Sequence, residues 1–179
     1  AAGLLASEDG GATWERRDGG IRSLAGPEDE PFEGACVHGV VADADNPDLI
    51  WRQDHSGVYR TEDGGRSWQV TERGLPTCFG FPIARDTASG NLFVVPLAAD
   101  VNRVPVDGRM RAYRSTDGGE SWQVAGRGWS DHPCFAGVLR RAVATDGEGG
   151  VCLGTTAGDL WASEDAGDTW QQLPMQLPR

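Results

Sequence analysis

The sequence predicts an all-β protein, a β-propeller of four-stranded antiparallel blades, and three observations support this prediction. An eight-residue segment recurs four times in the 179 residues, with central aspartates at Asp9, Asp63, Asp117 and Asp165. These aspartates lie 54, 54 and 48 residues apart, and a repeat of about 50 residues is typical of propeller blades. Glycine is abundant, at 26 residues without a collagen period, which indicates many tight turns.

Each repeat has the composition of a turn that closes on itself and ends in an indole. An aspartate side chain can accept hydrogen bonds from the backbone N–H groups just ahead of it, and Ser or Thr hydroxyls add further bonds. A glycine two residues after the aspartate supplies a backbone angle with φ > 0. We expect the closing tryptophans to bury their rings at the start of the next strand. These tryptophans are Trp14, Trp68, Trp122 and Trp170.

The apolar pattern predicts four short strands in each complete blade, with the repeated turn between the third and the fourth. In the first complete blade the expected strands are 36–42, 49–53, 57–61 and 67–71. The equivalent strands are 81–85, 92–97, 111–115 and 121–125 in the second blade, and 139–145, 151–155, 159–163 and 169–173 in the third. The chain opens with a third and a fourth strand alone, at 4–7 and 13–16.

The predicted divisions are therefore residues 1–20 for the second half of a blade, then 32–74, 75–127 and 128–174 for three blades of one propeller domain. A propeller ring closes to hide its strand edges. We therefore expect the chain to be a fragment of about three and a half blades, with the rest of the ring in sequence beyond it.

Composition narrows the classes of partner. The formal net charge is −11, with 27 acidic and 16 basic residues, so we predict no binding to nucleic acid, which needs a positive surface. We predict no membrane segment, because no run of about 20 apolar residues occurs. The four cysteines have no CxxC spacing, so neither a zinc knuckle nor a redox motif is indicated. The expected location is the cytoplasm of a bacterium or its exterior, as a soluble protein.

The eight-residue segments resemble the Asp-box, also called the bacterial neuraminidase repeat (S-x-D-x-G-x-[TS]-W). Further segments are similar to uncharacterised bacterial Asp-box proteins labelled glycosyl hydrolase or exo-alpha-sialidase, and they are Gln53–Gly57, Gly74–Pro76, Phe79–Ile83, Phe93–Leu97 and Val138–Arg140. The resemblance implies that the boxes occupy one face of the propeller, remote from ligands. We expect ligands on the opposite face, formed by residues 16–35, 54–57, 73–80, 98–108, 127–137 and 156–158. We call this face the loop face.

Binding and catalytic candidates are therefore sought on or beside the loop face. We predict that a ligand contacts two imidazoles and three guanidiniums, which are those of His55, Arg103, Arg109, His132 and Arg140. Glycoside hydrolysis needs two carboxyls flanking the bond, and Asp54 and Asp100 could form that pair. If Asp54 has this role, its replacement by alanine should leave folding intact and impair the activity.

Metal binding is the less favoured interpretation of the histidines, and the sequence predicts no cofactor. The metal candidates are His38, His55 and His132, and Cys36-x-His38 and His132-x-Cys134 occupy equivalent blade entries, with Cys78 at the third. Imidazoles and thiolates suit zinc, but no short ligand spacing supports such a site. Small cysteines packed near the propeller axis explain the same pattern.

The resemblance to sialidases implies a tyrosine nucleophile, an arginine cluster and an aspartate acid. Tyr59 and Tyr113 share the repeat position that Leu5 and Trp161 hold elsewhere, which indicates a packing position rather than a nucleophile. We therefore predict a non-catalytic propeller that binds a protein or a glycan through the loop face. The alternative is a sialidase-like or other glycoside hydrolase whose remaining catalytic residues lie outside this fragment.

Overall fold

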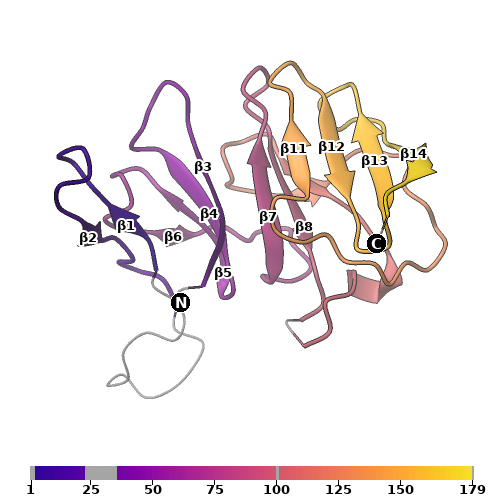
Figure 1. The fold of residues 1–179 in the computed structure, drawn as a ribbon, viewed down its shortest axis with the longest axis horizontal. Coiled ribbons are helices and arrows are strands. Elements are labelled where there is room, and N and C mark those ends of the chain that lie inside the picture. Colours follow the sequence, from indigo (N-terminus) through magenta and orange to yellow (C-terminus); the bar gives the residue numbers. More distant parts are fainter. Residues whose placement is uncertain (1–2, 23–35, 100, 179) are drawn as a thin grey trace.

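The protein is a series of antiparallel sheets, seen in a computed structural model that describes residues 3–22, 36–99 and 101–178. A two-stranded hairpin is followed by three four-stranded sheets, and the strands of each sheet lie side by side in chain order (Figure 1). Within the described ranges the only helical element is the single 3₁₀ turn η1 (Val106–Gly108). The predicted all-β class of four-stranded antiparallel blades is confirmed.

The strands are short, as expected for propeller blades. The hairpin pairs β1 (Leu5–Ala6) with β2 (Glu15–Arg16). The first complete sheet contains β3 (Val37–Ala42), β4 (Ile50–Asp54), β5 (Gly57–Thr61) and β6 (Gln69–Val70). The second contains β7 (Gly80–Arg85), β8 (Leu92–Pro96), β9 (Tyr113–Ser115) and β10 (Gln123–Val124). The third contains β11 (Val143–Thr145), β12 (Val151–Gly154), β13 (Asp159–Ser163) and β14 (Gln171–Gln176).

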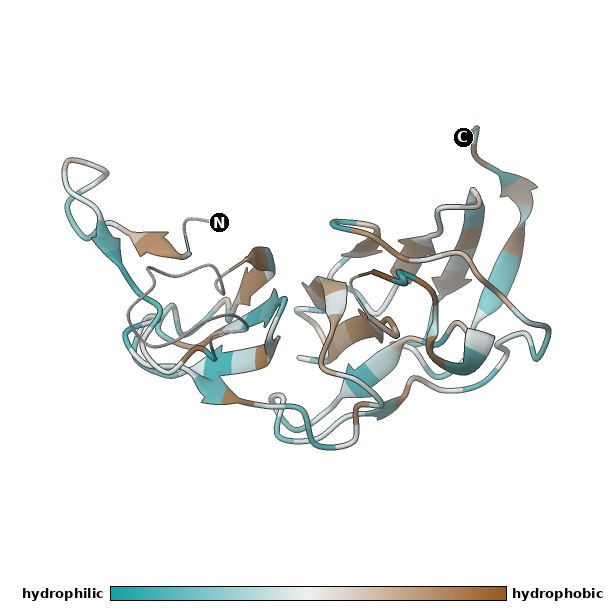
Figure 2. Cartoon of the chain, turned by 90° about the horizontal axis from the view of Figure 1, so that it is seen from below, coloured by the Kyte–Doolittle hydropathy of each residue, from teal (hydrophilic) through white to brown (hydrophobic). Residues whose placement is uncertain are grey.

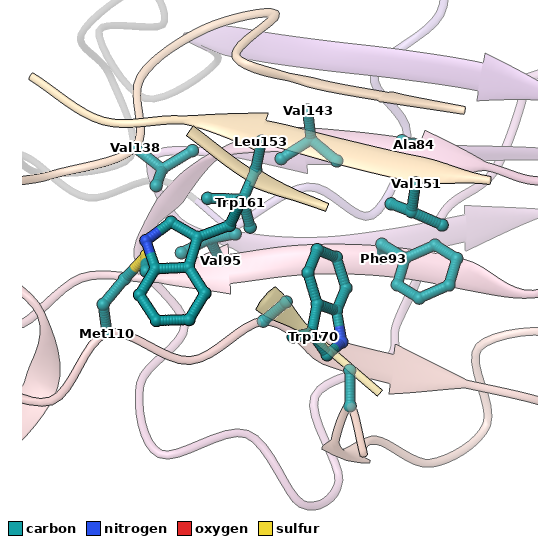
Figure 3. Close-up of a cluster of buried hydrophobic side chains, with 12 residues drawn as sticks. Ala84, Phe93, Val95, Met110, Val138, Val143, Val151, Leu153, Trp161 and Trp170 are labelled. Atoms are coloured by element: carbon teal, nitrogen blue, oxygen red, sulfur yellow. The ribbon is translucent and has the colours of Figure 1, made fainter. Parts of the chain in front are cut away.

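The hydrophobic core lies between successive sheets, so the central strands are buried on both faces. β7 contacts β3 on one side and β11 on the other. Between the first and second complete sheets, Trp51, Ile83 and Trp122 share one buried cluster. The cluster between the second and third sheets joins Phe93 to Trp161, Trp170 and the valines and leucine shown in Figure 3. Figure 2 shows hydrophobic stretches on several of the strands, beside hydrophilic ones.

The four repeated turns have one hydrogen-bond pattern, which the sequence predicted. In the first turn, the Asp9 carboxylate accepts the Thr13 N–H at 2.8 Å and the Thr13 hydroxyl at 2.6 Å. The Ser7 hydroxyl oxygen accepts the Gly11 N–H at 2.7 Å. The same bonds recur around Asp63, Asp117 and Asp165. All these bonds lie within eight residues, so each turn is determined locally.

These bonds make the stability of the protein sensitive to acid. The hydroxyl and backbone N–H of Thr169 lower the pKa of Asp165 to about 2, and the equivalent bonds from Thr13 lower the pKa of Asp9 to about 2. An unfolded aspartate titrates at about 3.9. A lowered pKa in the folded state stabilises the protein above the unfolded value, and this contribution is lost as the pH falls through the folded value. The window of loss therefore runs from about pH 4 to about pH 2.

We predict that Asp165→Asn shows a smaller loss of stability than the unsubstituted protein when the pH falls from 4 to 2. The urea midpoint, measured at half-unit pH intervals, checks this. Glu164→Gln is the control, because Glu164 is an exposed carboxylate of the same turn. The prediction would be contradicted if the urea midpoint of Asp165→Asn fell with pH as steeply as that of the unsubstituted protein.

Three of the four repeat tryptophans are buried as expected, and the prediction for Trp14 is wrong. Trp68, Trp122 and Trp170 are each 4% exposed, whereas Trp14 is 62% exposed. The Trp68 indole donates to the Arg17 carbonyl and the Trp122 indole donates to the Thr71 carbonyl, each from the preceding sheet. A repeat tryptophan is therefore covered by the sheet before it in the chain. The described residues contain no sheet before Trp14.

A second repeated feature links the end of each sheet to the next turn. The backbone N–H groups of Trp68, Trp122 and Trp170 donate, at 2.7, 2.8 and 2.8 Å, to carbonyls of the segment that follows the preceding sheet. A Cβ atom on Gly74 or Gly128 would overlap the carbonyl oxygen of Trp122 or Trp170, and both glycines have positive φ. Glycine therefore stands six residues after the repeat tryptophan because two backbones meet there.

Several strands are shorter than predicted, and the shortening of one of them affects the loop face. The sequence predicted a strand over 139–145, but β11 contains only Val143–Thr145. A turn occupies the first half, where the Ala142 N–H donates to the Leu139 carbonyl at 3.1 Å and Arg141 has a φ of 58°. The apolar run that suggested a strand instead folds back, and the turn carries Arg140 to the loop face.

Candidate functional site on the loop face

The candidate site lies where β3 and β7 begin and at the turn between β4 and β5. The Gln53 side chain is buried and its amide donates to the carbonyls of Asp54, Gly57 and Cys78, at 2.9, 3.2 and 3.1 Å. These three bonds hold the β4–β5 turn against the entry to β7. The turn therefore presents His55 at a fixed place on the loop face.

Four aromatic rings form the centre of the site. His38 stacks on Phe81 with ring centroids 4.5 Å apart and an interplanar angle of 28°. Phe79 makes edge contacts with both histidines and with Phe81, at centroid distances of 5.1 to 5.8 Å. His38, Phe79 and Phe81 are buried, and His55 is partly exposed. The cluster thus has a rigid apolar base with one imidazole near solvent.

The two imidazoles are hydrogen-bonded to each other in a defined orientation. His38 Nδ1 lies 2.6 Å from the Gly80 carbonyl oxygen, which can only accept, so Nδ1 carries the proton. His38 Nε2 then accepts from His55 Nδ1 at 2.9 Å. Burial lowers the pKa of His38; the Gly80 bond opposes this, while the charges of His55 and Arg140 lower the pKa further. The neutral form of His38 is therefore favoured.

Two arginines stand over the same phenylalanine ring. The guanidinium carbon of Arg103 lies 5.2 Å from the Phe81 ring centroid, and that of Arg140 lies 5.4 Å from it. Arg140 Nη2 is also 3.7 Å from Cys36 Sγ. Both arginines are exposed and come from different connections, β8 to β9 and β10 to β11. This geometry places two positive charges within 5.4 Å of the centre of one aromatic ring.

Asp54 does not face this cluster as an accessible carboxylate. It is completely buried, and its carboxylate forms an ion pair with the buried guanidinium of Arg52. Asp18 pairs with the same guanidinium, and the Ser56 N–H donates to Asp54 at 3.2 Å. A general acid or nucleophile must reach its substrate, and this carboxylate is enclosed by protein groups. Asp100, its suggested partner, lies outside the described residues.

The remaining sequence candidates are dispersed. His132 is exposed and lines a separate hollow with Cys134, Met110 and Trp161. Arg109 is exposed immediately after η1. The structure therefore brings together His38, His55, Arg103 and Arg140, and it places His132 elsewhere. Of the cysteines named above, Cys36 lies with His38 and His55, and the ligand atoms of these three residues are within 4.8 Å of one another.

Sequence reasoning did not single out Phe79 and Phe81 as site residues. Their i, i+2 spacing at a strand entry directs both side chains to one side of the strand, and this was the available signal. For Tyr59 the predicted packing role agrees with the structure, because this residue is fully buried and hydrogen-bonded to Ser56 at 2.7 Å. Burial raises the pKa of Tyr59, which disfavours the phenolate that a nucleophile needs.

Both the repeat and the fold have counterparts among known proteins. The model of the BNR/Asp-box repeat matches residues 113–124, which contain the turn around Asp117. No curated protein sequence matches the chain. An ancestral GH74 enzyme is similar in structure, with a TM-score of 0.68 and 18% identity over 96% of this chain. The chain carries the Asp-box repeat on a β-propeller fold.

Two further propellers are similar in structure. The GH74 enzyme of Niastella koreensis has a TM-score of 0.65 and 18% identity over 95% of this chain. YCF48 bound to D1 peptide has a TM-score of 0.56 and 17% identity over 86% of this chain. The Asp-box propeller described here spans 21% of the ancestral enzyme, 26% of the Niastella koreensis enzyme and 45% of YCF48. At these identities the similarity establishes the fold alone. Across the described residues, no helix has the length and apolar character needed to traverse a bilayer.

Proposed function

We propose that this Asp-box propeller binds a carboxylate-bearing protein segment on its loop face and does not catalyse a reaction. The observation that carries the proposal is the pair of exposed arginines, Arg103 and Arg140, whose guanidinium carbons lie 5.2 and 5.4 Å from the centre of the Phe81 ring. A guanidinium is a planar fork that grips a carboxylate with two parallel hydrogen bonds. Two such forks from separate connections form a receptor for one carboxylate or two neighbouring ones.

The surroundings of the arginine pair favour a protein partner. Val101 and Phe135 are exposed large apolar residues in the same two connections that carry Arg103 and Arg140. The connections contact each other, because the Cys134 N–H donates to the Gly108 carbonyl at 2.7 Å. Arginine and aromatic residues dominate the energetic centres of protein interfaces. The protein as a whole is negatively charged, with a formal charge of −11. A local pair of positive side chains therefore determines where an anion approaches it.

The proposal is further supported by the environment of the residues that hydrolysis would need. Asp54 is enclosed in an ion pair with Arg52, and Tyr59 is enclosed beneath Ser56. A glycosidase requires a carboxyl that can protonate the leaving oxygen. YCF48, a propeller of similar fold, has been solved bound to D1 peptide, so this fold is compatible with peptide binding.

Fluorescence anisotropy with two labelled hexapeptides tests the proposal. The peptides share one apolar sequence and differ only in a free or an amidated C-terminus. We expect the free carboxylate to bind at least about tenfold more tightly, because a hydrogen bond to a charged group contributes about 1.5–3 kcal/mol. Arg103→Ala and Arg140→Ala should each remove most of this preference. Arg66→Ala is the control, because it removes one positive charge in the same way. Arg66 lies in an Asp-box turn, and its side chain is 54% exposed.

Equal binding of the two peptides would contradict the carboxylate proposal. An acidic oligosaccharide, oligogalacturonate, is the comparison probe. Tighter binding of this probe than of either peptide would assign the loop face to a glycan, and release of reducing ends from it would favour the hydrolase.

A further inference from the structure

A cysteine and two histidines meet at the entry of β3 and the β4–β5 turn, next to the pair Arg103 and Arg140. The ligand atoms of Cys36, His38 and His55 all lie within 4.8 Å of one another. Two imidazole nitrogens and one thiolate sulfur are a ligand set that zinc prefers. Cys36 and His55 are partly exposed while His38 is buried, so an ion could enter from the solvent side.

His38 is already oriented as a metal ligand would be. Its Nδ1–H donates to the Gly80 carbonyl at 2.6 Å, which leaves the lone pair of Nε2 directed at His55. Metal-binding histidines typically donate their second ring N–H to a carbonyl or carboxylate in this way. Gly80 begins β7 and pairs with Pro96 of β8, so the orienting carbonyl belongs to the rigid sheet.

The two imidazole nitrogens need only a small movement to hold an ion. Zinc with bonds of about 2.0–2.1 Å to nitrogen and tetrahedral angles holds two nitrogens about 3.3 Å apart, whereas His38 Nε2 and His55 Nδ1 are 2.9 Å apart. The rings would separate slightly as the hydrogen bond between them is replaced. The proton on His55 Nδ1 moves to Nε2 of that ring, and the Cys36 thiol releases its proton to solvent.

We propose that Cys36, His38 and His55 form a zinc site with a fourth position open to water or an anionic ligand. A cysteine thiolate reduces the charge of the bound ion, and Arg140 Nη2, 3.7 Å from Cys36 Sγ, donates a hydrogen bond to the same sulfur. Asp54, the nearby carboxylate, is already neutralised by Arg52. The ion would tie the entry of β3 to the β4–β5 turn, and the site does not depend on the proposed binding function.

Loading the chain with Zn²⁺ or Co²⁺ under reducing conditions tests the site. After desalting, we expect one equivalent of zinc per chain, and the cobalt form should show thiolate-to-cobalt charge-transfer absorption with the visible bands of tetrahedral Co²⁺. Cys36→Ser should abolish the charge-transfer band. His55→Asn should weaken zinc binding at least about tenfold, since loss of even an outer-shell partner costs 10–100-fold.

The double variant His132→Asn/Cys134→Ser is the matched control, because its residues occupy the equivalent entry of another sheet in a separate hollow. It should retain both the stoichiometry and the spectrum. Arg103→Ala should also retain the stoichiometry and the spectrum. This result would distinguish the zinc site from the arginine pair that is proposed to bind a carboxylate. Urea unfolding of Cys36→Ser and His55→Asn without metal establishes that these variants are folded. Less than a tenth of an equivalent of bound zinc, or a charge-transfer band that persists in Cys36→Ser, would overturn the proposal.

Discussion

Replacement of Asp54 by alanine is expected to lower the free energy of unfolding by about 3–5 kcal/mol, the cost of removing one partner from a buried ion pair. Arg52 and Asp54 are both completely buried, and the Arg52 guanidinium lies 5.3 Å from the centre of the Trp68 ring. Without Asp54, the buried positive charge of Arg52 keeps Asp18 alone as an anionic partner among the residues that the structure describes. Desolvation of an incompletely paired charge is therefore the physical reason for the loss.

Urea unfolding followed by tryptophan fluorescence measures this change. Asp131→Ala is the control, because Asp131 pairs with Arg111 while its side chain is 88% exposed. An exposed ion pair contributes between about 0 and 1 kcal/mol. If Asp54→Ala lost no more stability than Asp131→Ala, the Arg52 pair would not be desolvated as the structure has it. The sequence suggested that this substitution leaves folding intact, and the buried pair is the reason that we now expect the opposite.

Replacement of Trp122 by alanine is also expected to cost about 3–5 kcal/mol, as for other large aromatic core truncations. The ring is 4% exposed, packs in the cluster that contains Trp51 and Ile83, and donates to the Thr71 carbonyl at 2.9 Å. Its removal leaves a cavity between two sheets and an unpaired carbonyl. Both effects act on the interface that joins successive blades.

Trp14→Ala is the matched control for Trp122→Ala. The two residues close the same eight-residue turn, but the Trp14 ring is 62% exposed. We expect a change within about 0.5 kcal/mol, as for surface substitutions. The comparison uses the free energy of unfolding in urea for both variants. A loss for Trp14→Ala as large as that for Trp122→Ala would show that the turn, rather than the contact between blades, requires the indole.

The repeated turns could be predicted because their bonds are local. The Asp117 carboxylate accepts the N–H and the hydroxyl of Ser121, four residues away, so the motif contains both partners of each bond. Whether the repeat tryptophan is buried is not determined by residues close to it in the chain. Trp122 is buried by Thr71 and its neighbours, about 50 positions earlier in the chain. Trp14 and Trp122 close turns of the same motif, and the neighbouring sheet decides which of the two rings is buried.

The candidate site was predicted only in part for the same reason. Arg103 and Arg140 were expected on the loop face, but their convergence on Phe81 depends on the turn that shortens β11. His38 and His55 belong to different strands, and the Gly80 carbonyl that orients His38 comes from the next sheet. No spacing along the chain encodes such a meeting.

The sequence alone determined the period of the blades, the strands around each turn and the hydrogen bonds of the Asp-boxes. All of these arise from contacts between residues that are close in the chain. The tertiary structure decided which charges and rings are buried. Asp54 became a structural partner of Arg52 and Trp14 stayed in solvent, because burial depends on what another sheet places against a side chain.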